Sequence, residues 1–481
     1  MPRADGDDER RSCALQGATA PDAPEAVTRA SGGGRSDRSP TARPVRGSSR
    51  AVADAARSRR WAVAVPLLLV LLAGGLRFAR LDEPERMYFD EVYYVVDAQE
   101  YLRQGVEEVR PAHPPVGKWL IAAGIAVAGD ESFGWRVAPA LAGTLTVLVT
   151  YLLGLRLFRR RAPAALAGLL LALDGLAFTM SRVGMLDVFV GLFVALGALL
   201  LVVDRDDPGR RWRLLTGVSF GLAIGTKWSA ALALLVAVAV VVARDRSLRR
   251  IVVPLLVVPT SVYVLGWSGW LVSYSNTEES VEQCEAGRCG TSPVDRVVGL
   301  VDEHRELVEF HLDLEPKHAY RSAAWRWPLL QRPVLTYFER CPRDDGKPCA
   351  VADGMRARIV TLGNPVLWWG FALATPFLAW LALRRRDGTA GFVLAFAVGQ
   401  WAPWLLTKPG YLFYMVPMVP FMALGLAWAL HRLPRPRLRL GAGVAGACLA
   451  VAAFAFWYPV WSGVETTKAV QDDRMWFDSW R

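Results

Sequence analysis

Residues 162–178 read APAALAGLLLALDGLAF, an almost unbroken apolar run that gives the first indication of the architecture. Residues 61–76 and 230–243 contain similar runs. All three approach the length of about 20 residues that a helix needs to cross a bilayer. Apolar residues make up 53% of the 481 residues and the mean hydropathy is +0.24, which is unusual for a soluble domain. The sequence therefore predicts an all-α integral membrane protein.

The basic residues gather at the ends of apolar segments. Six clusters occur, at residues 57–60, 159–161, 210–213, 244–250, 384–386 and 432–439. This is the positive-inside pattern of membrane proteins. The net charge of +11 would also suit a nucleic-acid-binding protein, but no basic stripe with interleaved aromatic residues lies outside the membrane ends. No nucleic-acid partner is therefore expected.

Placing every arginine cluster on the cytoplasmic side gives about eleven transmembrane helices. The expected crossings are 60–80, 134–157, 162–180, 188–203, two within 214–243, 251–272, 365–383, 389–406, 411–431 and 441–461. This arrangement places the N-terminus in the cytoplasm and the C-terminus outside the cell membrane.

Five regions follow from these crossings. They are a disordered cytoplasmic tail (1–58), seven transmembrane helices with a first outer loop at 81–133 (59–272), a second outer loop (273–364), four transmembrane helices (365–461) and an extracytoplasmic tail (462–481). Residues 116–128 are apolar but too short to cross, so we expect them to form an interfacial helix in the first outer loop.

Four cysteines lie in the second outer loop, namely Cys284, Cys289, Cys341 and Cys349. In an oxidising compartment they predict two disulfides, for which three connectivities exist. The close spacings favour Cys284–Cys289 and Cys341–Cys349, because short loops close readily. A zinc site is the alternative, although zinc knuckles more often use two-residue spacings.

Asp90 and Glu91 are the most informative residues of the first outer loop, where they stand within FDEVYY (89–94). An adjacent acidic pair is most often a solvated loop feature. Here the flanking residues are apolar and aromatic, so the pair is expected to be partly buried. Because desolvation raises the pKa of a carboxyl group, one of the two would then be suited to act as a general base.

Two cations are expected on the same outer side. Arg136 opens the second crossing, and Lys227 lies in the turn GTKW (225–228). Arg136 at a helix end can simply extend to the headgroups. A lysine in so apolar a setting is costly unless it is paired or functional. Either cation is suited to hold a lipid phosphate.

Three further residues are weaker candidates for binding the phosphate or the sugar. His113 belongs to HPPVGK (113–118), where a purely structural turn is equally plausible. Arg182 and Asp187 belong to SRVGMLD (181–187). For these two, an ion pair that closes the turn is the favoured interpretation.

Together these motifs resemble bacterial protein O-mannosyltransferases, members of the GT-C superfamily that use lipid-phosphate sugars. The resemblance covers about residues 60–465. The motifs, in chain order, are FDEVYY (89–94), HPPVGKWL (113–120), FGWRVAPALAGTL (133–145), SRVGMLD (181–187), GLAIGTKW (221–228), FHLDLEPKHAYRSAAWRWPLLQRPV (310–334), LGNPVLWWG (362–370) and GYLFYMVPMVPF (410–421).

The resemblance implies transfer of mannose from polyprenyl-phosphate mannose to Ser or Thr hydroxyls of secreted or membrane proteins, with inversion, at the outer face of the membrane. It makes Asp90 and Glu91 the catalytic pair and assigns the donor phosphate to Arg136 and Lys227. The donor carries its own leaving group, so no metal or other cofactor is expected. An association with the protein translocation machinery is a further expectation.

Two alternatives remain. A GT-C enzyme that glycosylates a lipid or a wall polysaccharide would keep the same fold and change only the acceptor. A lipid transporter would be expected to show inverted repeats and charged residues at mid-membrane, and neither feature is visible here.

Overall fold

The computed structural model describes residues 47–106, 112–244, 248–287, 289–313, 319–342, 346 and 348–481. The chain divides into two units, residues 1–57 and 58–481. The second unit is described here by itself.

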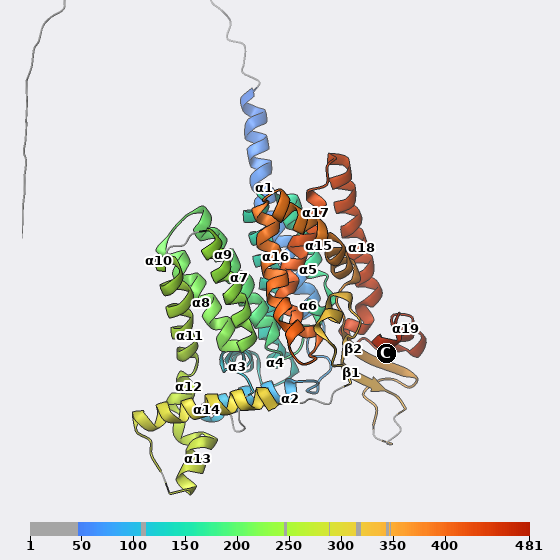
Figure 1. Cartoon of the computed structure of the whole chain (residues 1–481). Coiled ribbons are helices and arrows are strands. Elements are labelled where there is room, and N and C mark those ends of the chain that lie inside the picture. The colour runs from blue at the N-terminus through green and yellow to red at the C-terminus, as the bar shows by residue number, and fades with distance from the viewer. Residues whose placement is uncertain are drawn as a thin grey trace, which may run out of the picture. The chain divides into compact units, whose positions relative to one another are not determined.

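Helices form nearly all of this unit (Figure 1). The α-helices are α1 (Gly47–Phe78), α2 (Glu91–Gln104), α3 (Val116–Ala128), α4 (Ser132–Phe158), α5 (Arg161–Ala172), α6 (Gly175–Met180), α7 (Asp187–Asp206), α8 (Arg210–Thr226), α9 (Ala231–Arg244), α10 (Leu248–Val252), α11 (Val258–Gly266), α12 (Ser268–Val272), α13 (Glu278–Glu285), α14 (Pro293–Asp313), α15 (Pro365–Arg384), α16 (Gly388–Trp401), α17 (Val419–His431), α18 (Pro436–Ser462) and α19 (Lys468–Asp472). Short 3-10 or π turns are η1 (Trp228–Ala230), η2 (Val253–Val257), η3 (Tyr274–Asn276), η4 (Ala324–Leu329), η5 (Ala402–Leu406), η6 (Leu412–Met418) and η7 (Asp478–Trp480).

Seven helical segments of the described chain are long and apolar enough to cross a membrane. They are 60–78, 132–158, 187–206, 365–384, 388–406, 412–431 and 436–462. Shorter apolar helices lie at 116–128, 161–172, 228–244 and 253–266. Each predicted crossing falls on a helix or on consecutive helices, and the predicted interfacial segment is α3. The chain is a multi-pass membrane protein, and the number and direction of its crossings stay predictions.

The centre of the bundle is formed by α4, α7 and α17. Most of each of these apolar segments is buried inside the protein, whereas only 17% of the α1 and α18 segments is buried. α7 packs against α4 and α8, and α17 packs against α5 and α15. α1 and α18 are therefore peripheral helices whose apolar surfaces face lipid.

Three segments that are predicted to lie outside the membrane meet at one end of the bundle. The first outer loop touches the second, because the Tyr88 and Tyr337 ring centroids are 5.6 Å apart. The C-terminal segment touches the second loop through a hydrogen bond of 2.6 Å from Trp480 Nε1 to the Leu330 carbonyl. α2, α3 and α14 lie at this end as well (Figure 1). We call it the site end.

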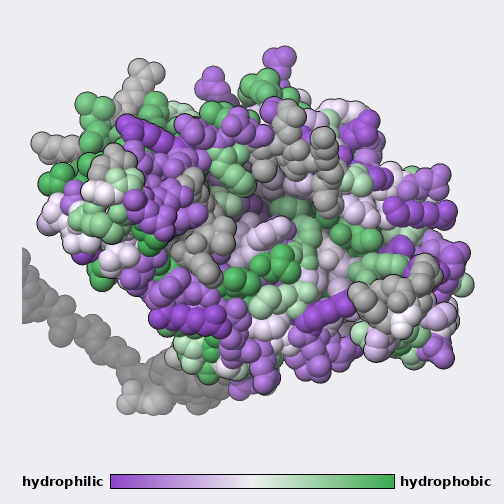
Figure 2. Space-filling view, turned by 90° about the horizontal axis from the view of Figure 1, so that it is seen from below, coloured by the Kyte–Doolittle hydropathy of each residue, from purple (hydrophilic) through white to green (hydrophobic). Residues whose placement is uncertain are grey.

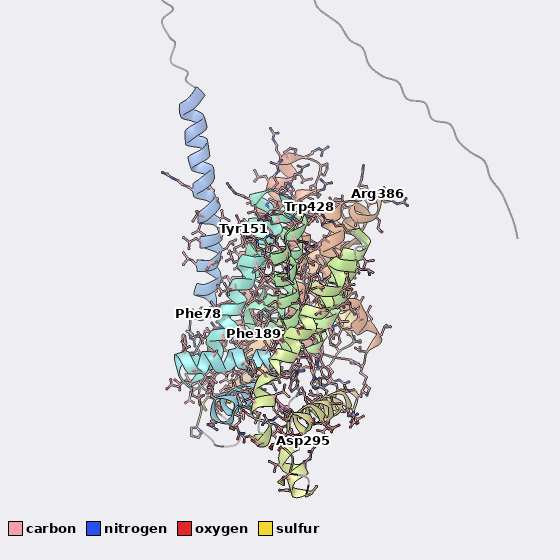
Figure 3. All side chains as sticks on the ribbon, turned by 90° about the vertical axis from the view of Figure 1, so that its left-hand side faces the viewer. Phe78, Tyr151, Phe189, Asp295, Arg386 and Trp428 are labelled. Carbon is pink, nitrogen blue, oxygen red and sulfur yellow. A yellow bond between two sulfur atoms is a disulfide. The ribbon has the colours of Figure 1, made fainter. Side chains whose placement is uncertain are left out.

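Arginine clusters occupy the opposite end. Arg159 pairs with Asp206 at 2.8 Å, and Arg432 pairs with Asp387 at 3.3 Å. Figure 3 shows this separation, since its labels place Arg386 at one end and Asp295 at the other. We call this the Arg-rich end.

The second outer loop contains a small antiparallel sheet that the sequence analysis did not predict. Its strand order is β1 (Val334–Arg340), β2 (Met355–Thr361) and β3 (Thr466–Thr467), with Val334 opposite Thr361. The Cys341–Cys349 disulfide closes the β1–β2 hairpin, and a second disulfide joins Cys284 to Cys289. The predicted disulfide pairing is therefore confirmed.

The structure adds detail to both predicted tails. α1 begins at Gly47, inside the stretch predicted as a disordered tail. The residues before Ser58 include several alanines, which have the highest helix propensity. Residues 1–46 of that tail lie outside the described residues. The predicted C-terminal tail is folded, because β3 pairs with β2 and Trp480 is only 3% exposed.

Candidate active site

The sequence Tyr88-Phe89-Asp90-Glu91 leads into α2 at the site end. Phe89 has φ 56°, in the left-handed region that non-glycine residues rarely adopt. Its ring packs edge-on against Phe413, with the centroids 5.6 Å apart. Asp90 is the N-cap residue of α2 and Glu91 is its first residue. Successive residues of a helix point about 100° apart, so the two carboxylates enter different surroundings.

Glu91 is fully buried and accepts hydrogen bonds on both oxygens. Arg136 Nε donates to Oε1 at 2.7 Å and Arg136 Nη2 donates to Oε2 at 2.9 Å. The backbone N–H of Gly184 donates to Oε1 at 2.8 Å, and that of Tyr88 donates to Oε2 at 3.2 Å. A buried charge is tolerated when it is paired and hydrogen-bonded, and Glu91 meets both conditions.

Arg136, like Glu91, makes all of its hydrogen bonds to groups of the protein. Besides the carboxylate, it donates to the carbonyls of Leu81, Pro84 and Arg86 at 3.2, 2.8 and 3.1 Å. A guanidinium has five N–H donors, and all five are used in these bonds. The side chain is 0% exposed. The prediction that Arg136 holds a donor phosphate does not fit this geometry, because no donor remains for it.

Asp90 has the opposite environment. Its side chain is half-buried and receives no hydrogen bond from any residue that the structure describes. Burial raises the pKa of Asp90 to about 6, with Lys227 lowering it and Asp187 raising it. Tyr411 and Tyr414 also lie within electrostatic reach of this carboxylate. An unpaired carboxylate with a pKa near neutrality is suited to general base catalysis.

Lys227 is the C-cap residue of α8 and lies within electrostatic reach of Asp90. Its Nζ lies 3.1 and 3.0 Å from the two carboxylate oxygens of Asp187, the first residue of α7. The same Nζ is 5.0 Å from the centroid of the Tyr414 ring. Both members of the pair are buried, at 8% and 3% exposure. The pair therefore fixes a cation at the site without neutralising Asp90 directly.

Arg182 and Asp187 do not pair with each other. Arg182 donates to the carbonyls of Arg77, Ala79 and Arg80 at 2.8, 2.6 and 2.8 Å. These carbonyls lie at and just beyond the end of α1, where helices leave acceptors without a partner. The predicted Arg182–Asp187 ion pair is wrong, because Arg182 caps α1 and Asp187 binds Lys227. The location of Arg182 also leaves it unsuited to binding the phosphate or the sugar.

A cavity of about 610 Å³ opens beside Lys227 at the site end. Its lining combines cations, aromatic rings and apolar side chains. The lining residues are His113, Lys227, Trp228, Ser229, Ala231, Leu232, His311, Leu312, Arg321, Pro403, Trp404, Thr407, Lys408, Pro409, Gly410, Tyr411 and Tyr414. Figure 2 shows the site end from below, where hydrophilic side chains surround a hollowed centre with apolar residues also visible. Such a lining suits an amphiphile with an anionic head.

His113 lies in this cavity lining, as the sequence predicted for a binding residue. Its ring centroid is 5.5 Å from that of His311 on α14 and 6.0 Å from that of Tyr94 on α2. Burial, Lys227 and Lys118 hold the pKa of His113 well below its usual range. His113 is therefore a neutral hydrogen-bonding group at neutral pH and not an additional cation.

Two family models match most of the described chain. The model for "Dolichyl-phosphate-mannose-protein mannosyltransferase" matches residues 112–270, and the model for the "C-terminal four TMM region of protein-O-mannosyltransferase" matches residues 298–480. The polyprenol-phosphate-mannose–protein mannosyltransferase of Mycobacterium tuberculosis is 30% identical, over 88% of this chain and 92% of the relative. The chain belongs to the protein mannosyltransferase family. The relative of the same name from Corynebacterium glutamicum is 29% identical, over 88% of this chain and 93% of its own.

Solved structures confirm the fold of the mannosyltransferase. The S. cerevisiae protein O-mannosyltransferase Pmt1-Pmt2 complex bound to the sugar donor gives a TM-score of 0.74 at 13% identity, covering 87% of this chain and 92% of that one. ArnT from Cupriavidus metallidurans bound to undecaprenyl phosphate gives 0.54 at 20% identity, covering 82% and 64%. The GT-C fold predicted from the sequence is therefore confirmed.

Several lining residues of the mannosyltransferase cavity were missed as site residues. Arg321 comes from the second outer loop (273–364), and Lys408, Tyr411 and Tyr414 come from the segment after the predicted crossing at 389–406. One signal was available, since lysines are rare in this chain and both Lys227 and Lys408 line the cavity. The aromatic residues gave no such signal, because tyrosine is common near membrane interfaces.

Proposed function

We propose that this chain transfers mannose from polyprenyl-phosphate mannose to Ser or Thr hydroxyls of exported proteins, with inversion at the anomeric carbon. The observation that carries the proposal is the half-buried carboxylate of Asp90, which has no hydrogen-bond partner among the described residues and lies within electrostatic reach of Lys227, a buried lysine that lines an amphiphilic cavity. The family and the names of its mycobacterial and corynebacterial relatives support the donor and the acceptor class.

Asp90 is the base in this proposal. A Ser or Thr hydroxyl oxygen attacks the anomeric carbon and forms the new C–O bond, while its proton passes to the Asp90 carboxylate. The bond between the anomeric carbon and the phosphate oxygen breaks, and the phosphate leaves with the electron pair. One displacement inverts the centre, so a β-linked donor gives an α-linked product. Glu91 is not free to take this proton, because four donors already hold it.

The cations of the cavity stabilise the departing phosphate. Lys227 lies within electrostatic reach of Asp90, and Arg321 and Lys408 line the same cavity as Lys227. Fixed positive charge acts where the negative charge develops, and it is most effective where water is excluded. The apolar lining residues, including Leu232 and Pro403, provide a surface for the start of the isoprenoid chain.

The site end is proposed to face outward from the plasma membrane, with the N-terminus in the cytoplasm. The arginine clusters at the opposite end support this orientation, because cytoplasmic loops are enriched in Arg and Lys. The contact between the first outer loop, the second outer loop and the C-terminal segment supports a common side for all three. A periplasm-type reporter fused after Arg481 should be active, and activity only of a cytoplasmic reporter would refute the orientation. Association with the translocation machinery stays a prediction.

The test of function uses the purified full chain with polyprenyl-phosphate mannose that carries radiolabelled mannose. We expect label to enter a Thr-rich peptide and to be released by an α-mannosidase. A lipid or polysaccharide acceptor that takes label while the peptide does not would refute the protein acceptor. Label released only by a β-mannosidase would refute the inverting mechanism.

A further inference from the structure

A second cavity of about 610 Å³ lies far from the active site, between α1, α5, α17 and α18 at the Arg-rich end. Its walls are apolar, with Leu72 from α1, Leu166 from α5 and Ala447 from α18. Among the described residues that line it, the only polar side chains are His431 and Arg439. Two of the four helices, α1 and α18, are the peripheral ones, with only 17% of each span buried. We call this cavity the peripheral groove.

The mouth of the peripheral groove is strongly basic. Arg439 is half-buried there, and its Nε donates to the Leu433 carbonyl. Its two terminal nitrogens make no hydrogen bond or ion pair to a residue in the described part of the chain. Arg160 and Arg432 lie close enough to the His431 ring to interact with it electrostatically, as Arg439 does. The groove thus joins an apolar slot to a cluster of cations, like a receptor for an anionic amphiphile.

We propose that the peripheral groove binds one anionic phospholipid of the surrounding leaflet, with its phosphate at Arg439 and an acyl chain along α1, α5 and α18. Basic pockets between transmembrane helices are suited to anionic headgroups. His431 and Arg439 lie at the Arg-rich end, where the arginine clusters mark the predicted membrane interface. In this proposal the charged mouth lies at the level of the headgroups and the apolar slot at the level of the hydrocarbon.

The charge distribution favours a phospholipid that carries net negative charge. A zwitterionic lipid would bring an ammonium group to a mouth that already holds several arginines. Asp387, the N-cap residue of α16, is paired with Arg432 at 3.3 Å. It therefore does not offset the positive charge of Arg439. The polyprenyl phosphate released by the reaction forms at the site end, and a phospholipid needs no movement across the membrane to reach the groove.

Two variants test the two parts of the proposed site, namely the contact with the headgroup and the apolar slot. Arg439→Gln removes the charge. Gly443→Leu fills the slot, because a Cβ at Gly443 meets nothing nearer than Leu166 at 4.0 Å. The matched controls are Gly441→Leu on the same helix, where a Cβ meets nothing within 4 Å, and Arg385→Gln, whose guanidinium lies over Trp380 at 4.9 Å outside the groove.

Native mass spectrometry of the purified full chain, after exchange into an equimolar phosphatidylglycerol and phosphatidylcholine mixture, tests the proposal. We expect wild type to retain one phosphatidylglycerol in preference to phosphatidylcholine. Arg439→Gln should lower that retention about fivefold, the effect of one cation near a membrane surface. Gly443→Leu should abolish it, and both controls should behave as wild type.

Three results would overturn the proposal. One is equal retention of the two lipids by wild type, which requires no variant and so does not depend on variant folding. Another is full phosphatidylglycerol retention by Gly443→Leu. The third is displacement of the phosphatidylglycerol by equimolar polyprenyl phosphate, which would assign the groove to the carrier lipid.

Discussion

The adjacent carboxylates Glu91 and Asp90 lie in different surroundings. Glu91 is buried and held by Arg136 and two backbone N–H groups. Asp90 is half-buried, has no hydrogen-bond partner among the described residues and lies within electrostatic reach of Lys227, which is paired with Asp187. The mechanism proposed above therefore gives the two adjacent carboxylates different roles.

The hydrogen-bonding groups of Glu91 are satisfied without a substrate, whereas those of the Asp90 side chain have no partner among the described residues. In the described part of the chain, both carboxylate oxygens of Glu91 and all five N–H donors of Arg136 have partners, which fixes the first outer loop onto α4 and onto the turn before α7. Asp90 keeps its accepting capacity for a group that arrives from outside the protein. Complete pairing is typical of a structural unit, and unused capacity with a raised pKa is typical of a reacting group.

The largest expected effect is that of Asp90→Asn on turnover. The amide keeps the shape and cannot accept a proton at neutral pH, so the rate of mannosyl transfer should fall by about 10²–10⁴-fold. The measurement is initial rate with saturating donor and peptide. Glu85→Gln, which changes an exposed carboxylate of the same loop, should leave the rate unchanged.

The thermal stability of Asp90→Asn separates loss of chemistry from loss of fold. The folded pKa of Asp90 is about 6, above the ordinary value of 3.8. Its contribution to stability is therefore present at acid pH and is lost as the pH rises through about 6. At pH 7 the amide variant should be at least as stable as wild type. Near-normal transfer by a folded Asp90→Asn protein would assign the base elsewhere.

The next effect concerns the other carboxylate. Glu91→Gln and Arg136→Gln each leave one partner of a buried ion pair uncompensated, which typically costs about 3–5 kcal/mol of stability. Both should lower the midpoint of detergent denaturation, while Asp90→Asn should not. If Glu91→Gln were as stable as wild type and inactive, Glu91 would have a direct role in chemistry and the comparison would fail.

The sequence alone predicted much of the fold, for identifiable reasons. Apolar runs and arginine clusters are local features, so the helices and their order followed from them. The β1–β2 hairpin did not, because β1 (334–340) lies in a loop whose polar and apolar residues alternate over only a few positions. The folded C-terminal segment depends on the pairing of β3 with β2. These strands are far apart in the sequence, so no local sequence pattern predicts their pairing.

The different environments of Asp90 and Glu91 were not predictable from neighbouring residues. It depends on Gly184 and Arg136, which reach Glu91 from other segments. For the same reason Arg182 was assigned the wrong partner, since the carbonyls at the end of α1 are invisible in the sequence. Lys227 was found because a lysine in an apolar helix turn is already exceptional.

A smaller effect is expected at Lys227. Lys227→Gln removes one cation from the leaving phosphate and should lower kcat/KM for the donor about 10–100-fold, the range for a hydrogen bond to a charged group. Lys227→Arg keeps the charge and should retain more activity than the glutamine variant. Equal loss in both would indicate that Lys227 acts only by holding Asp187, and not by its charge toward the donor.

The smallest effect, and the sharpest check on the Asp90 environment, is the pH dependence of kcat/KM. A general base acts when ionised, so activity should rise with pH through about 6, the pKa of Asp90, and level off above it. Asp187 raises this pKa by its negative charge and Lys227 lowers it. Asp187→Asn should therefore move the acid limb to lower pH. The release of Lys227 from its partner acts in the same direction, because an unpaired ammonium stabilises the Asp90 carboxylate further.

Glu85→Gln, away from the Lys227–Asp187 pair, should leave the acid limb of the pH profile in place. A limb that moves to higher pH in Asp187→Asn would mean that the titrating group is not Asp90, since no removal of a neighbouring negative charge makes a carboxyl harder to ionise.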